Sequence, residues 1–177
     1  MSSSVAIYEL TFNIFAEQIR KIKVGSIGHT GIKKIAKAVL LLSVIKGIED
    51  GRFKTNRFSY DDVEEIYKNV FGKYAESAKQ TEHTPAYYPF YHLRTSDFWN
   101  LEPLVPGHSQ MSTNTPSPAW LRGNVAHARL DPALWELLQM PAYRHRMAEF
   151  IIDEKIKTAT AGQRSFLHAL LCWLVAV

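Results

Sequence analysis

Apolar residues recur at helical spacing in several separate segments of the chain, which predicts a mainly helical protein. Residues 5–22 form the first such segment, an amphipathic helix followed by a glycine-rich stretch. Its apolar positions are Ile7, Leu10, Ile14, Phe15 and Ile19. Residues 32–50 are apolar in their middle, which predicts a central buried helix. Gly51 follows it, as is typical of a helix C-terminal stop.

Capping signals predict three further helices. Ser59, followed by an acidic residue three positions later, fits the N-terminal cap of an amphipathic run. Asp131 and Pro132 form an N-cap and first-turn pair for a short helix, and Pro141 opens another. Residues 103–118 have the composition of a loop.

One β element is predicted where aromatic and β-favouring residues crowd together, in residues 86–105. The pattern predicts two short strands around a turn at residues 95–97. Pro89 would lie at an edge or at a strand start, where its missing N–H does least harm. The expected fold class is therefore α+β: a compact, mainly helical domain with a short β-hairpin or small sheet.

Length and cysteine content exclude several classes of protein. A chain of 177 residues accommodates one domain, and its single Cys excludes an internal disulfide scaffold and a multi-cysteine zinc site. The first 30 residues carry no secretory signal pattern, so we expect a cytoplasmic protein.

Charge is distributed unevenly along the chain. The net charge of +4 hides a basic stretch at residues 20–57, where ten Lys and Arg residues face two acids, and an acidic stretch at residues 61–82. A solvated helix face would explain such clustering, and so would a polyanionic partner.

The chemistry-bearing residues form no catalytic constellation. The seven His are scattered, and Cys172 lies in an apolar run with no cation beside it. The glycine-rich residues 25–31 match neither phosphate-binding fingerprint. Acidic residues 61–65 are typical of a helix N-terminus rather than of a metal site. We expect no catalytic residue, no metal and no cofactor.

The end of the chain is apolar. After Gly162 the run FLHALLCWLVAV is interrupted only by His168, and it is too short to cross a bilayer, so no membrane partner is expected. It is either a core helix or an exposed end that seeks a protein partner. We therefore divide the chain into a domain at residues 1–157 and an apolar tail of uncertain role at residues 158–177.

Three blocks of sequence, in this order, resemble a known family. They are KAVLLLSVIKGIEDG at residues 37–51, YPFYHLRTSDFW at residues 88–99 and ARLDPALWELLQ at residues 128–139. They look like the DNA sulfur-binding domain of HNH-type modification-dependent restriction endonucleases. The resemblance implies a non-catalytic reader of double-stranded DNA in which sulfur replaces a non-bridging phosphate oxygen. A dry apolar pocket favours sulfur, because oxygen is better hydrated and accepts hydrogen bonds more strongly.

The resemblance also assigns residues to the sulfur pocket. Its Tyr-Pro pair falls on Tyr88 and Pro89, and the small residue three positions after that Pro falls on His92. A His followed by a basic residue falls on Ala36 and Lys37. His92 and Ala36 therefore depart from the family pattern. The expected DNA phosphate contacts are Arg20, Lys21, Lys33, Lys34, Lys37 and Arg94.

Several alternatives remain open at this point. The imidazole of His92 narrows the pocket, swings aside, or marks a reader of unmodified or differently modified DNA. In a different class, the chain is a non-catalytic interaction or scaffold protein of a restriction or defence system, docked on a protein partner through the residues after Gly162. A third reading makes it the N-terminal part of an HNH endonuclease, whose catalytic domain or subunit lies outside this sequence.

Overall fold

The structure is a computed structural model that describes residues 3–107 and 112–162. Two strands, β1 (Trp99–Pro103) and β2 (Val125–Leu130), pair in an antiparallel sheet. The helical elements are α1 (Ser3–Arg20), α2 (Ala36–Glu49), α3 (Tyr60–Ala75), α4 (Tyr87–His92), the 3-10 turn η1 (Leu93–Thr95), α5 (Pro118–Asn124), α6 (Pro132–Gln139), α7 (Pro141–Ile151) and the π-helical turn η2 (Ile152–Lys157). The predicted α+β class is confirmed.

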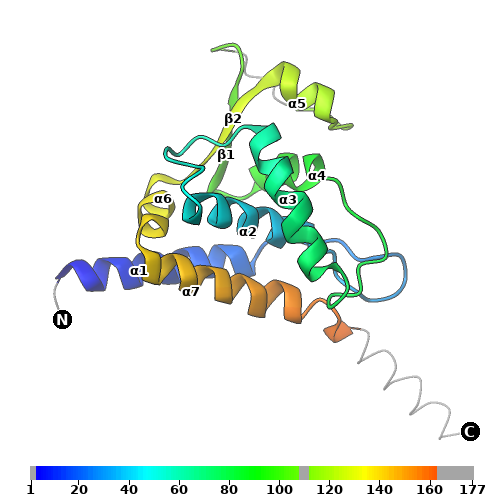
Figure 1. Cartoon of the computed structure of the whole chain (residues 1–177), viewed down its shortest axis with the longest axis horizontal. Coiled ribbons are helices and arrows are strands. Elements are labelled where there is room, and N and C mark those ends of the chain that lie inside the picture. Colours follow the sequence, from blue (N-terminus) through cyan, green and yellow to red (C-terminus); the bar gives the residue numbers. More distant parts are fainter. Residues whose placement is uncertain (1–2, 108–111, 163–177) are drawn as a thin grey trace, which may run out of the picture.

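Helix α2 is the centre of the fold. Helices α1 and α7 run side by side on one side of it, and α3 crosses its other side toward the sheet (Figure 1). Val39 and Leu40 of α2 are completely buried, which confirms the predicted central helix. The helix begins four residues later than predicted, because backbone bonds outside the helix hold the preceding residues. The N–H of Lys33 donates to Ala159 O and that of Lys34 donates to Gly25 O, both at 2.8 Å.

Helix α1 is confirmed, but its predicted apolar face was partly wrong. Three of the five predicted positions, Ile7, Leu10 and Ile14, are exposed. The side that packs into the core is turned away from them and consists of Phe12, Phe15, Ala16 and Ile19. This helix therefore carries two apolar stripes, and spacing alone could not tell which stripe would be covered.

The predicted helix starts are confirmed. Ser59 Oγ accepts a hydrogen bond from the N–H of Asp62 at 3.1 Å, which caps α3. Asp131 Oδ1 accepts from the N–H of Ala133 at 2.8 Å and caps α6, while Pro141 opens α7. Gly51 ends α2 with a φ of 71°, a left-handed conformation that glycine adopts without steric cost.

The first of the two predicted strands is wrong. Residues 87–92 form helix α4, with Pro89 in its first turn, where a missing N–H costs no helical hydrogen bond. Aromatic density suggested a strand, but these rings pack in a helical arrangement against the core. The second predicted strand is β1. It pairs with β2, which follows the predicted loop of residues 103–118 in the chain. The sequence did not predict β2 or the short helix α5 before it.

Trp99 of β1 connects α4 to the sheet through a hydrogen bond and ring packing. Its indole is completely buried, and Nε1–H donates to the carbonyl of Phe90 at 2.9 Å. The ring of Phe90 meets the Trp99 ring edge-on at 5.5 Å, and the Phe58 ring stacks on Trp99 at 6.0 Å. Because these contacts fix the middle of α4, they also fix the direction in which its exposed side chains point.

Most of the predicted tail lies outside the described residues. The described part ends at Gly162, and Ala159 within it is buried and accepts the backbone bond from Lys33. The division of the chain at residue 157 stays a prediction. No helix in residues 3–107 and 112–162 is long and apolar enough to cross a membrane.

Candidate nucleic-acid interface

A cavity of about 620 Å³ opens at the N-terminal end of α2, between the α1–α2 connection and α4. It brings together all five residues that the resemblance assigns to the sulfur pocket. These are Ala36, Lys37, Tyr88, Pro89 and His92. They come from two helices separated by about fifty residues of chain, so the fold rather than local sequence assembles them.

The helical form of α4 is what places three of these residues on one wall. In a strand, Tyr88 and Pro89 would point to opposite faces, whereas in a helix residues at i, i+3 and i+4 share a face. Tyr88, Pro89 and His92 therefore all reach the cavity. Little surface of Pro89 and Ala36 is exposed, whereas Tyr88 is 43% exposed; since all three line the cavity, its wall contains ring and methyl carbons.

Lys37 brings a positive charge to the edge of this apolar wall. It lies in the first turn of α2 and is half-buried, and this burial lowers the pKa of its ammonium group. Its Nζ donates to the backbone carbonyl of Lys23 at 3.1 Å. No described carboxylate pairs with Lys37, so its charge is available to an anion in the cavity.

His92 forms part of the wall. Its ring lies parallel to that of Tyr88, with centroids 6.3 Å apart, and meets Tyr91 edge-on at 5.1 Å. Burial, followed by the charges of Lys37 and Arg94, lowers the pKa of this imidazole. The ring therefore enters the cavity as a neutral aromatic surface at neutral pH.

The other predicted phosphate-contacting lysines lie at different places relative to the cavity. Lys34 lines it directly. Lys21 lines a neighbouring hollow of about 270 Å³, which shares Lys23 and Thr95 with the cavity. Lys33 does not line either hollow, and its Nζ lies 3.4 Å from Ser26 Oγ.

The two predicted arginines are engaged with other side chains. Arg94 donates to the hydroxyl of Tyr91 at 2.8 Å, with its guanidinium 3.9 Å from the centre of that ring. Arg20 forms ion pairs with Glu17 and Glu154 and does not line the cavity. Of the two, only Arg94 contributes charge to the region around His92.

Further lining residues were not predicted as site residues. They include Lys23, which the basic stretch of the sequence already contained, and the residues Glu82, His83 and Pro85 that precede α4. Glu82 is the one carboxylate among the residues that line the cavity. No sequence motif marked this connection, because it reaches the cavity only through the packing of α3 and α4.

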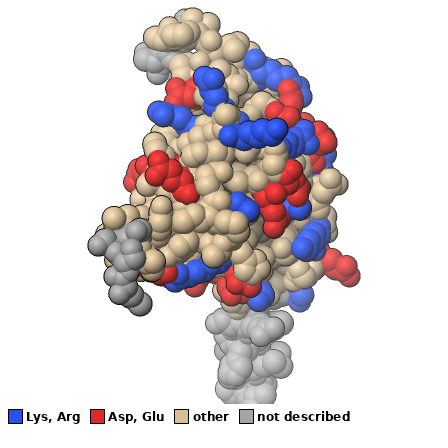
Figure 2. Space-filling view, turned by 60° about the vertical axis from the view of Figure 1, so that its left-hand side comes forward, with Lys and Arg blue, Asp and Glu red and all other residues tan. Residues whose placement is uncertain are grey.

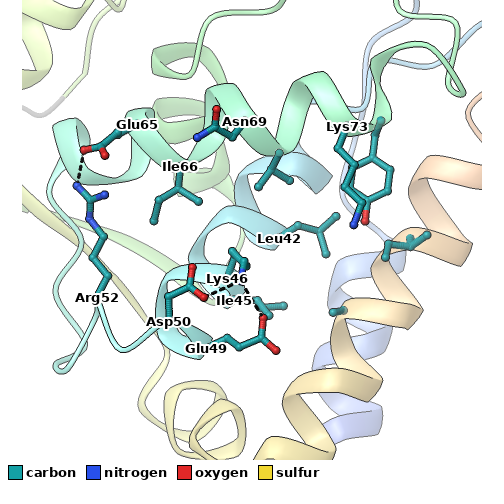
Figure 3. A pocket seen from close by; sticks show the side chains of 14 residues that line it. Leu42, Ile45, Lys46, Glu49, Asp50, Arg52, Glu65, Ile66, Asn69 and Lys73 are labelled. Carbon is teal, nitrogen blue, oxygen red and sulfur yellow. Dashed lines mark hydrogen bonds and ion pairs between the residues drawn. The ribbon is translucent and has the colours of Figure 1, made fainter.

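A second hollow, a groove of about 530 Å³, lies at the other end of α2 between α3 and α7. Leu42, Ile45 and Ile66 give it an apolar floor and wall, and charged side chains form its rim (Figure 3). Lys46 pairs with Asp50 at 2.6 Å, and Arg52 pairs with Glu65 at 2.6 Å. The third cation of the groove, Lys73, has no ion pair with a described carboxylate and lies 5.4 Å from the centre of the Tyr74 ring, so two of the three cations here are paired.

Paired charges are also common on the rest of the surface. On the face shown in Figure 2, Lys and Arg side chains lie next to Asp and Glu side chains, around an area without charge. Within the basic stretch of the sequence, some Lys and Arg side chains therefore form ion pairs with acidic side chains and others do not. Among residues 3–107 and 112–162, no cluster of His, Cys, Asp and Glu could hold a metal ion.

Fold and site together define a small helical module with an apolar cavity ringed by lysines. The family model of the ScoMcrA-like DNA sulfur-binding domain matches residues 13–170, and the chain belongs to this family. The fold is similar to that of the sulfur-binding domain of SprMcrA, which was solved in complex with phosphorothioated DNA. The TM-score is 0.59 at 16% identity, over 81% of this chain and 85% of that one. A search among curated proteins finds no matching sequence.

Proposed function

We propose that this protein is a DNA-binding module that recognises phosphorothioate-modified double-stranded DNA through the cavity at the N-terminal end of α2. The observation that carries the proposal is the convergence of Ala36, Lys37, Tyr88, Pro89 and His92 on one cavity. Family membership and the fold shared with a domain bound to phosphorothioated DNA support it.

The sulfur would rest against the apolar wall of the cavity. The apolar wall offers carbon surfaces from Pro89, Ala36 and the ring of Tyr88. Pro89 also has no backbone N–H that could donate to an oxygen. An oxygen placed there loses its hydration without gaining hydrogen bonds, whereas sulfur loses less because it is a weaker acceptor and more polarizable. The preference for sulfur then arises from the difference between these two desolvation costs.

The lysines around the wall would supply affinity that does not depend on sulfur. Lys23, Lys34 and Lys37 line the cavity, Lys21 lines the neighbouring hollow, and the charge of Arg94 reaches His92. Lys33 precedes Lys34 in the connection before α2. Contacts between ammonium groups and phosphates release counterions and make binding dependent on salt. Arg20 would join these contacts only by giving up its present pairing with Glu17 and Glu154.

The proposed role is binding without catalysis, either alone or as the N-terminal part of an HNH endonuclease. The described residues that line the cavity include no Ser or Cys. The single carboxylate lining it, Glu82, is accompanied by cations and no metal cluster is formed by the described residues. Cleavage, where it occurs, would then come from a domain or subunit that this sequence does not include.

A paired titration tests this function. The full chain is titrated into one labelled duplex with a single phosphorothioate and into the identical unmodified duplex, at several salt concentrations. We expect tighter binding of the modified duplex and a similar salt slope for both. Equal affinities would leave a general DNA-binding protein, and no salt-dependent binding of either duplex would favour the interaction or scaffold protein.

A further inference from the structure

The departure at His92 places a titratable ring in a wall that must remain apolar to prefer sulfur. His92 is the last residue of α4, and it sits one helical turn from Tyr88, with its ring parallel to that of the tyrosine at 6.3 Å. The Tyr91 ring supports it from the side at 5.1 Å. These two contacts hold the imidazole at the cavity wall.

Every nearby charge that affects this imidazole in the free protein is positive. Lys37 of α2 and Arg94 of η1 face it, and with burial they lower the pKa of the imidazole. The other titratable groups that line the cavity are Lys23, Lys34, Glu82, His83 and Tyr88. No described carboxylate pairs with His92, so nothing in the free protein favours its charged form.

A bound phosphate group reverses this balance. Its negative charge favours the imidazolium, which has two N–H donors where the neutral ring has one. The additional N–H of the imidazolium can donate a charge-assisted hydrogen bond to the bound group. This bond is stronger to a phosphate oxygen than to a sulfur, because oxygen is the stronger acceptor. Protonation would therefore help unmodified DNA more than modified DNA.

We propose that His92 sets how strongly the cavity prefers sulfur over oxygen: its neutral ring completes the apolar wall, and its charged ring admits an ordinary phosphate. This inference rests on the proposed function. It makes His92 a specificity-determining residue, and it predicts that acidification tightens the binding of both duplexes. The gain is larger for unmodified DNA, so the affinity ratio between the two duplexes falls as the pH falls.

The test is the paired titration repeated between about pH 8 and about pH 5.5, a range that spans the titration of histidine. For the unaltered chain we expect the ratio to fall by about tenfold, the size of one charge-assisted hydrogen bond. His92→Asn is polar but does not titrate, so its ratio should stay constant. His92→Ala, which restores a small residue, should also give a constant ratio and still prefer sulfur.

His145→Asn is the matched control, because His145 does not line the cavity and its ring pairs with Glu149 of α7 at 3.3 Å. In this variant the affinity ratio between the two duplexes should change with pH as it does in the unaltered chain. The inference is overturned if the affinity ratio does not change with pH in the unaltered chain, or if it still changes with pH in both His92 variants. Either result leaves the proposed function intact. Absence of any sulfur preference even at about pH 8 would instead overturn the proposed function.

Discussion

The two ends of helix α2 differ in how their charges are used. At its C-terminal end Lys46 and Arg52 pair with acids along the rim of the groove. At its N-terminal end no described carboxylate forms an ion pair with Lys34 or Lys37, which lie beside an apolar wall. Both ends belong to one basic stretch of sequence. Pairing, rather than the number of cations, therefore distinguishes a surface suited to a polyanion from one that is already neutralised.

The largest effect is expected from removing the unpaired cations. Lys34→Ala with Lys37→Ala should weaken the binding of both duplexes by about a hundredfold, since one phosphate contact to a charged donor is worth about 1.5 kcal/mol. The slope of affinity against salt should fall by about two. Fluorescence polarisation over a range of salt measures both quantities.

Lys46→Ala is the matched control at the other end of α2. Its charge is already balanced by Asp50 and Glu49, so DNA affinity should not change. If Lys46→Ala weakened binding as much as the double variant does, the contrast between the two ends of α2 would be wrong.

A smaller and more selective effect is expected from the apolar wall. Pro89→Ala removes two ring methylenes, each worth about 0.8 kcal/mol when buried against a ligand, so the preference for sulfur should fall by about tenfold. Binding of unmodified DNA should change little. Isothermal titration with the two duplexes measures the ratio.

Pro141→Ala serves as the control, because Pro141 also lies in the first turn of a helix but far from the cavity lining. Pro141→Ala should not change the affinity ratio between the two duplexes. A ratio unaffected by Pro89→Ala would remove Pro89 from the sulfur pocket.

The smallest effect is expected at the groove and concerns stability alone. Arg52 lowers the pKa of Glu65 through a hydrogen bond, and hydrogen bonds from Ser59 and then from Arg52 lower the pKa of Asp62. Stability from carboxylates with lowered pKa values is present above their ordinary pKa of about 4 and is lost as the pH falls through the lowered values.

Arg52→Ala should therefore lower Tm by about 2 °C or less near neutral pH, because exposed ion pairs contribute little. The difference from the unaltered chain should shrink as the pH falls below about 4 and through the lowered pKa values, because the carboxylates become protonated. Thermal melts followed by circular dichroism, from neutral pH downward, measure it. A difference that persisted in acid would mean that Arg52 acts through packing rather than through its ion pairs.

The residues predicted for the sulfur pocket do lie together, although the sequence predicted the wrong local structure for them. Ordered sequence blocks placed Tyr88, Pro89 and His92 at the cavity, yet their aromatic density suggested a strand. Helix α4 forms because Phe90 and Tyr91 are buried in a helical arrangement that Trp99 fixes from β1. Those contacts are long-range, and local propensity does not include them.

Pairing of charges could not be predicted either. The basic stretch marked Arg20, Lys34 and Arg52 alike, but Arg20 meets Glu154 from more than a hundred residues away, and Arg52 meets Asp62 and Glu65 across a turn. Lys34 meets no described carboxylate. Only the fold decides which cations are neutralised, so the cations of the basic stretch that have no ion pair can be identified only from the structure.

Hydrogen exchange measured on the full chain, with and without a duplex that carries one phosphorothioate, tests whether DNA binds at the cavity. We expect slower exchange on DNA binding in residues 22–38 and 82–95, which contain the cavity lining. Residues 42–52 and 65–74, which line the groove, should exchange as before. Protection confined to the groove segments, with none at the cavity, would contradict DNA binding at the cavity.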